Sequence, residues 1–180
     1  TNIQERANFL LNNAGFFGYF PGYELAPAQV QLHYPGNMLG VSALPSRVEE
    51  GPLMFLGETR IQSFQARDYH HLMDCPIMVT VPDTTSFYVA NCKVTLSVYS
   101  ESGRPLSAAI YEEVKVSMEA IAAFLGGKLP VDNYAFLFYI KDYTEFKGLM
   151  EGDLKLGKAI KLLRQIIGQG FGALEHGNSS

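Results

Sequence analysis

The chain has 180 residues, of which 47% are hydrophobic and 18% charged, with a net charge of -4. This composition is typical of a globular protein and excludes an intrinsically disordered one. The 14 basic residues are scattered rather than clustered, which gives no basis for nucleic-acid binding. The sequence also lacks an apolar run of the roughly 18 residues that a membrane-spanning helix needs.

The amino-terminal residues 1–6 lack both the basic start and the apolar stretch of a signal peptide, and there is no initiator Met. A signal peptide already removed, which would imply export to the periplasm or beyond, and a start inside a longer polypeptide would both explain this. The compartment therefore stays open. Cys75 and Cys92 would pair in an oxidising compartment, but two free buried thiols are expected at least as often.

The first hundred residues predict short strands separated by turns. Apolar residues alternate with polar ones at 30–34 and at 94–98, which is the period of a β-strand. The stretches 77–81 and 86–90 flank a turn-forming segment and predict two strands joined by that turn. Many short strands of this kind favour an antiparallel sandwich or saddle-shaped sheet, and we assign residues 1–103 to this β-rich domain.

Two segments interrupt the strand pattern. Asp68 can cap a single helical turn that Pro76 ends, which predicts a short helix crossing from one sheet to another. The aromatic segment 16–23 contains a Pro-Gly turn. We expect its rings to pack into the core, and the alternative is an exposed platform on which a sugar or peptide stacks.

After Gly103 the pattern changes to that of helices and strands. Apolar residues recur at helical spacing from Ile110 to Leu125, with Ser107 as the expected N-cap and Gly126-Gly127 as the stop. The apolar run 134–140 predicts a strand covered on both faces. A second helix near 158–167 and a short extended segment at 171–176 follow. The predicted fold class is therefore α+β, with a second domain over residues 104–180.

The sequence offers no recognisable metal or nucleophile motif. Its four histidines are His33, His70, His71 and His176, and neither HExxH nor Cys-x-x-Cys occurs. Side chains of adjacent residues on a helix point about 100° apart, so His70 and His71 are expected to be surface or interface residues rather than ligands of one ion. No Gly-x-Ser-x-Gly is present either, and neither cysteine has an activating neighbourhood. We expect no metal site and no catalytic residue in this chain.

The last nine residues, 172–180, read Gly-Ala-Leu-Glu-His-Gly-Asn-Ser-Ser. Glycine permits close approach of a ligand to the backbone, and the Glu175 carboxylate can bind a cation such as a free α-amine. The residues alone leave open the alternative that Glu175 and His176 are solvated side chains near a frayed end.

Four stretches resemble the glycyl aminopeptidase family, zinc metallopeptidases of the thermolysin-like (gluzincin) clan. Residues 172–180 resemble its Gly-Gly-Leu-Glu-His-Arg-Asn-Ser-Ser/Thr motif, and residues 68–76 resemble its Asp-Tyr-x-x-Leu-Val-Asp-Ser-Pro motif. Residues 13–21 and 124–137 resemble two further motifs, and all four occur in the family's order. Ala173 and Gly177 depart from the family pattern, which has Gly and Arg there.

The resemblance implies an amino-terminal β domain followed by the first helix–strand elements of a thermolysin-like catalytic domain. It implies that the segment 172–176 is a strand that pairs with a peptide substrate, in which Glu175 holds the substrate's free amino terminus. Gly172 and Ala173 would offer main-chain groups, and His176 would orient Glu175 or line the cleft. The stretch 141–170 is longer than the family's usual one.

In the family, zinc is bound by an HExxH helix, which would follow Ser180. The resemblance therefore implies zinc in a longer parent protein, and we expect this chain by itself neither to bind catalytic zinc nor to hydrolyse peptides. The alternative function is a non-enzymatic β-sandwich module that binds a ligand through its aromatic patch. A helix and a last strand that lack their partners would expose apolar surface, so we also expect self-association.

Overall fold

The computed structural model describes residues 3–5, 8–52 and 57–140. The chain divides into two compact units, Thr1–Tyr139 and Ile140–Ser180, and the description below concerns the first. The helix predicted at 158–167 and the extended segment predicted at 171–176 lie outside the described residues. The domain boundary predicted at residue 103 stays a prediction.

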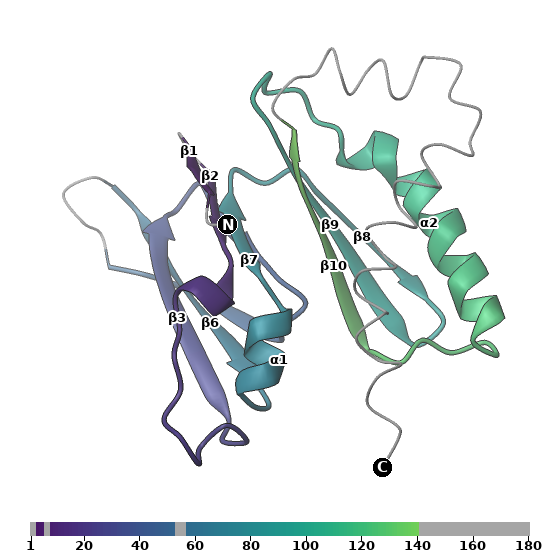
Figure 1. Ribbon diagram of the computed structural model, residues 1–180. Helices are drawn as coiled ribbons and strands as arrows, with labels where there is room; N and C mark the ends of the chain where they lie inside the picture. Colours follow the sequence, from purple (N-terminus) through teal and green to yellow (C-terminus); the bar gives the residue numbers. More distant parts are fainter. Residues whose placement is uncertain (1–2, 6–7, 53–56, 141–180) are drawn as a thin grey trace. The chain divides into compact units, whose positions relative to one another are not determined.

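The described part is α+β, as predicted, with three mostly antiparallel sheets and two α-helices (Figure 1). The first sheet has the order β1 (Ile3–Glu5), β2 (Asn8–Leu11), β7 (Ile77–Thr80), β4 (Leu39–Val41). The second has the order β3 (Ala28–Pro35), β6 (Thr59–Ala66), β5 (Ser46–Glu50). The third has the order β10 (Asn133–Ile140), β9 (Cys92–Ser100), β8 (Thr84–Val89). The α-helices are α1 (Tyr69–Asp74) and α2 (Ser107–Phe124), and a 3-10 helix covers Asn13–Gly15.

The first two sheets pack face to face as the predicted sandwich. Alternation along β3 turns Val30 and Tyr34 into the core and leaves Gln31 exposed. Val30 lies opposite Phe64 of β6, and the same hydrophobic cluster contains Ile77 of β7. The strands predicted at 30–34 and 94–98 are thus confirmed as β3 and β9.

The strands predicted at 77–81 and 86–90 are confirmed as β7 and β8, and a short segment connects them. The two strands do not pair with each other: β7 lies between β2 and β4 in the first sheet, whereas β8 pairs with β9 in the third. All four residues of β7 are buried, which suits a central strand. The hairpin instead forms around Ala90 and Asn91, with Ala90 in the left-handed region at φ 51°.

Helix α1 confirms the predicted capped turn that connects two sheets. The Asp68 carboxylate accepts a hydrogen bond from the backbone N–H of His71 at 2.7 Å. At the other end, the buried side-chain amide of Asn13 donates to the carbonyls of Leu72 and Cys75 at 2.8 and 2.7 Å. Both ends of this short helix are therefore satisfied by side chains.

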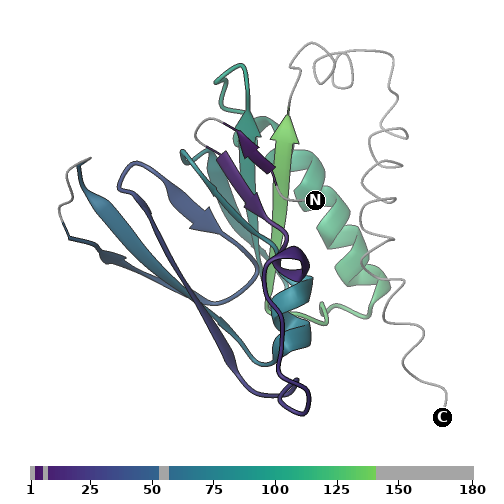
Figure 2. The ribbon, with the colours of Figure 1, turned by 60° about the vertical axis from the view of Figure 1, so that its left-hand side comes forward.

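The N-cap position of α2 is Leu106, one residue before the predicted Ser107. Ser107 is the first helical residue, and its hydroxyl lies 2.9 Å from the hydroxyl of Thr85. The cap is the Asp83 carboxylate, which accepts from the N–H groups of Leu106 at 2.6 Å and Ser107 at 3.2 Å. The helix ends as predicted, with Gly126 and Gly127 at positive φ. Figures 1 and 2 show α2 lying along the sheet of β8, β9 and β10.

Strand β10 occupies the predicted position. On one face Phe136 and Ile140 are buried, and on the other Ala135, Leu137 and Tyr139 are partly buried, so full coverage of both faces stays a prediction. In the described part of the chain β10 is an outer strand of its sheet, so its residues have a neighbouring strand on one side. Its Tyr139 ring stacks on Tyr99 of β9 with centroids 5.4 Å apart.

A buried amide joins the two sheets of the sandwich. Gln62 of β6 accepts hydrogen bonds from the Tyr34 hydroxyl and, at 3.1 Å, from the Gly40 N–H of β4. Its amide nitrogen donates to the Gly40 carbonyl at 3.0 Å and to Ser46 Oγ at 2.9 Å. A Cβ on Gly40 would lie 2.6 Å from Gln62 Oε1 and 2.9 Å from Phe64 Cζ. The contact therefore requires glycine at this position.

We predict that Gly40→Ala destabilises the fold by about 1–3 kcal/mol, because overpacking displaces the Gln62 amide from its backbone partners. Urea unfolding followed by far-ultraviolet circular dichroism measures this. Gly18→Ala is the matched control, since a Cβ there meets nothing within 4 Å. An unchanged unfolding midpoint for Gly40→Ala would show that the amide contact is dispensable.

We also predict that Asp83→Ala lowers the free energy of unfolding by about 0.5–2 kcal/mol, because two amide groups at the start of α2 lose their acceptor. Asp83→Asn keeps a side-chain oxygen and should lose less. The same unfolding measurement ranks the three proteins. Equal losses for both variants would contradict capping through a hydrogen bond.

Candidate functional site

The predicted substrate-binding residues Gly172, Ala173, Glu175 and His176 lie outside the described residues, so their roles stay predictions. Within residues 3–5, 8–52 and 57–140, no group of three or more His, Cys, Asp or Glu side chains gathers where it could hold a metal ion. The same part of the chain contains no helix long and apolar enough to cross a membrane. Its remaining candidates are two histidines, two thiols, a polar cleft and an aromatic surface.

The two adjacent histidines differ in their surroundings. His70 is exposed, with its ring 6.2 Å from that of Tyr69. His71 Nδ1 accepts a hydrogen bond from the Arg67 N–H at 3.2 Å, which requires that nitrogen to be unprotonated. Burial lowers the pKa of His71 and favours the same neutral form. His71 thus helps to order the start of α1.

Both thiols are buried and free. Burial raises the pKa of Cys75 to about 11 and also raises that of Cys92. Because the thiolate is the reactive form, neither group is set up as a nucleophile.

We therefore predict that neither thiol of the folded protein reacts rapidly with Ellman's reagent at pH 8, and that both react once the protein is unfolded in guanidinium. Ser102→Cys, at an exposed position, should label at once and serves as the control. Rapid labelling of the folded wild-type protein would contradict the burial of Cys75 and Cys92.

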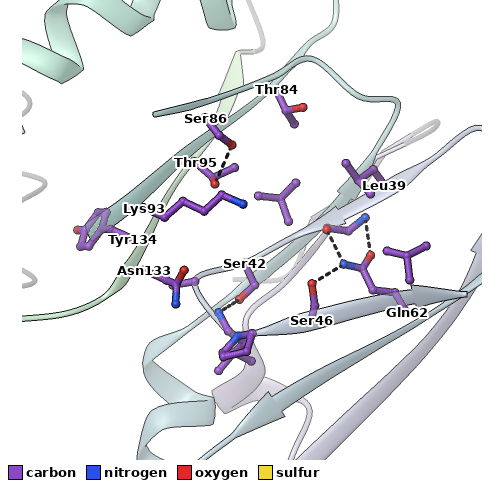
Figure 3. A pocket seen from close by; sticks show the side chains of 16 residues that line it. Leu39, Ser42, Ser46, Gln62, Thr84, Ser86, Lys93, Thr95, Asn133 and Tyr134 are labelled. Atoms are coloured by element: carbon purple, nitrogen blue, oxygen red, sulfur yellow. Dashed lines mark hydrogen bonds between the residues drawn. The ribbon is translucent and has the colours of Figure 1, made fainter. Parts of the chain in front are cut away.

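A polar cleft of about 460 Å³ lies where β4, β5 and β6 meet β8, β9 and β10 (Figure 3). On one wall the hydroxyls of Ser86 and Thr95 lie 3.0 Å apart, and on another the Gln62 amide is held by Gly40. Figure 3 shows the Lys93 side chain extending beside the Ser86–Thr95 pair. Lys93 is the one charged residue among those that line the cleft. Such a cleft can hydrogen-bond a ligand, but it pairs no acid with a base.

The aromatic segment forms an exposed surface, so the expectation that its rings pack into the core is wrong. We call residues 16–25 the aromatic loop. The exposed fractions of its large side chains are 56% for Phe16, 52% for Tyr19, 81% for Phe20, 69% for Tyr23 and 79% for Leu25. Phe17, the remaining large side chain of the loop, is partly buried and packs against the sandwich core. A hollow of about 530 Å³ lies between this loop, β3 and α1.

Local hydrogen bonds explain why the rings do not reach the core. The Tyr23 N–H donates to the Phe20 carbonyl at 2.9 Å, and the Ala26 N–H donates to the Tyr23 carbonyl at 3.0 Å. These turns project the loop beyond the amino-terminal end of β3, next to α1 (Figure 2). The density of aromatic residues around Pro21-Gly22 marks the segment in the sequence, but it does not tell a surface platform from a core cluster.

Comparison with known proteins relates the chain to peptidases. Residues 1–81 match the Peptidase M61 N-terminal domain. The fold resembles that of a crystal structure described as an aminopeptidase N family protein from Idiomarina loihiensis, with a TM-score of 0.59 and 18% sequence identity. The alignment covers 77% of this chain and 23% of that one, so the chain spans about a quarter of that protein's length. A search of curated proteins found no match.

At this identity the structural likeness shows a shared fold. The class that the fold defines is therefore a β-sandwich followed by a helix-covered sheet, as found in a protein of the aminopeptidase N family. The family match concerns residues 1–81, which are similar to the amino-terminal domain of M61 peptidases.

Proposed function

We propose that this chain is the amino-terminal portion of a zinc-dependent aminopeptidase of the glycyl aminopeptidase type, a gluzincin. The observation that carries the proposal is the match of residues 1–81 to an M61 peptidase domain in a chain that contains Gly-Ala-Leu-Glu-His at residues 172–176. The fold shared with an aminopeptidase N family protein supports it.

In this proposal the segment 172–176 binds the substrate. Gly172 and Ala173 present main-chain N–H and carbonyl groups to an extended peptide, which adds to the sheet as a further strand. Glu175 pairs with the peptide's free ammonium group, a charge-assisted hydrogen bond. His176 orients the Glu175 carboxylate or lines the cleft. The substrate is thus a peptide with an unblocked amino terminus.

The zinc ion of this proposal is not held by the described residues, because no set of candidate ligands gathers among them. Its ligands would belong to an HExxH helix encoded after Ser180. There, bound zinc would activate water and polarise the scissile carbonyl. The residues of this chain would bind and align the amino end of the peptide. The 180-residue chain alone should therefore show no peptidase activity with added zinc, and turnover by it would contradict the proposal.

The coding sequence after Ser180 separates this proposal from its alternative. An HExxH within about 100 residues, the size of an ordinary domain, supports the peptidase. A stop codon directly after Ser180 would overturn it and favour a non-enzymatic binding module. The exposure of the aromatic loop is the observation that keeps that module as the second candidate.

The role of Glu175 is tested in the protein extended through the HExxH segment. We predict that Glu175→Gln lowers kcat/KM for peptides with a free amino terminus by about 10- to 100-fold, which corresponds to the loss of one charged hydrogen bond. Glu112→Gln, at an exposed position on α2, is the matched control and should leave kcat/KM unchanged. Equal kcat/KM for wild type and Glu175→Gln would remove Glu175 from the substrate site.

A further inference from the structure

The aromatic loop is held in a defined shape by α1. The Tyr69 hydroxyl donates to the Phe17 carbonyl at 3.0 Å, and the Tyr69 N–H donates to the Glu24 carbonyl at 2.9 Å. The Tyr69 ring also contacts that of Tyr19, with centroids 4.8 Å apart. Because both halves of the loop are anchored, its exposed rings are ordered before any partner arrives, which reduces the entropy lost on binding.

The charge on this surface is negative. Glu24 is the only charged residue of the loop, and no Lys or Arg occurs between Arg6 and Arg47. Hydrogen bonds from its own N–H and from the Gly22 N–H lower the pKa of the Glu24 carboxyl, so it stays ionised while remaining exposed. The hydrogen bond from the His71 N–H likewise lowers the pKa of Asp68, at the adjoining end of α1.

The basic groups of the neighbourhood lie on α1 and just before it. His70 is close enough to Glu24 to act on its carboxyl, and Arg67 lies beside Asp68. The residues that line the hollow include no Lys, Arg, Asp or Glu. The surface thus combines exposed ring faces with an ionised carboxylate, and neither the loop nor the lining of the hollow contributes a Lys or Arg.

We propose that the aromatic loop and the hollow beside it bind a basic segment of another polypeptide. An Arg or Lys side chain of that segment lies over the exposed rings of Phe20 and Tyr23, with its cationic end at Glu24. Ring faces attract cations, and the apolar stems of Arg and Lys cover aromatic surface. Apolar side chains of the same segment fill the hollow.

Charge complementarity selects this occupant over the others. A two-fold contact between copies through the loop would bring Glu24 of one copy near Glu24 of the other. Neither loop contains a cation that would compensate this repulsion. Nucleic acid and anionic lipid would meet the same negative charge. The inference does not depend on the proposed peptidase function, since none of its residues belongs to the segment 172–176.

The probes are three acetylated, amidated hexapeptides that alternate Leu with Arg, with citrulline or with Glu, titrated into the 180-residue chain by isothermal calorimetry. We expect the Arg peptide to bind at least about tenfold more tightly than the citrulline peptide, and its affinity to fall as salt is raised. Phe20→Ser combined with Tyr23→Ser should weaken binding at least about tenfold, and Glu24→Gln about threefold or more.

The matched controls are Phe124→Ser, which removes a ring that is 89% exposed elsewhere, and Glu112→Gln; both should bind like wild type. Equal affinity for the three peptides, or none for any of them, would overturn the proposal. So would unchanged binding by the Phe20/Tyr23 variant. Sedimentation that shows a dimer dispersed by Tyr23→Ser would assign the loop to self-association instead, and binding to phosphatidylserine vesicles through the loop would assign it to membranes.

Discussion

The sandwich depends on a side-chain amide that takes the place of a neighbouring strand. The side chain of Gln62, in one sheet, forms hydrogen bonds with both the N–H and the carbonyl of Gly40 in the other sheet, as a neighbouring strand would. It also accepts a hydrogen bond from the Tyr34 hydroxyl. Because these groups are buried, loss of the amide would leave several of them unsatisfied at once. The same contact fixes one wall of the polar cleft, so the fold and the shape of that cleft share one cause.

Elements specified by neighbouring residues could be predicted from the sequence, whereas those specified by distant ones could not. The period-two strands β3 and β9 and the Asp68-capped α1 follow from local pattern. The α2 cap is the carboxylate of Asp83, more than twenty residues away in the sequence. The sequence pattern favours Ser107 as the cap because serine is a common N-cap residue. The partners of β7 are likewise remote, since β2 and β4 come from the first 41 residues.

The candidate functional surfaces could likewise be predicted from the sequence only in part. The aromatic segment is conspicuous in the sequence, but its exposure depends on turns at Phe20 and Tyr23 and on bonds to Tyr69 that composition does not encode. The similarity to M61 peptidases covers residues 1–81, while the proposed substrate strand lies in a different part of the chain. We thus propose two separate interaction regions, one for the amino end of a peptide substrate and one for a basic partner.

The most direct measurement is a crystal structure of the protein extended beyond Ser180, with a peptide-like inhibitor that carries a free amine. The account predicts that a Glu175 carboxylate oxygen lies about 2.7–2.9 Å from the inhibitor's ammonium nitrogen, the length of a charged hydrogen bond. It also predicts that the inhibitor backbone pairs with the segment 172–174. An inhibitor bound elsewhere, with Glu175 facing solvent, would contradict it.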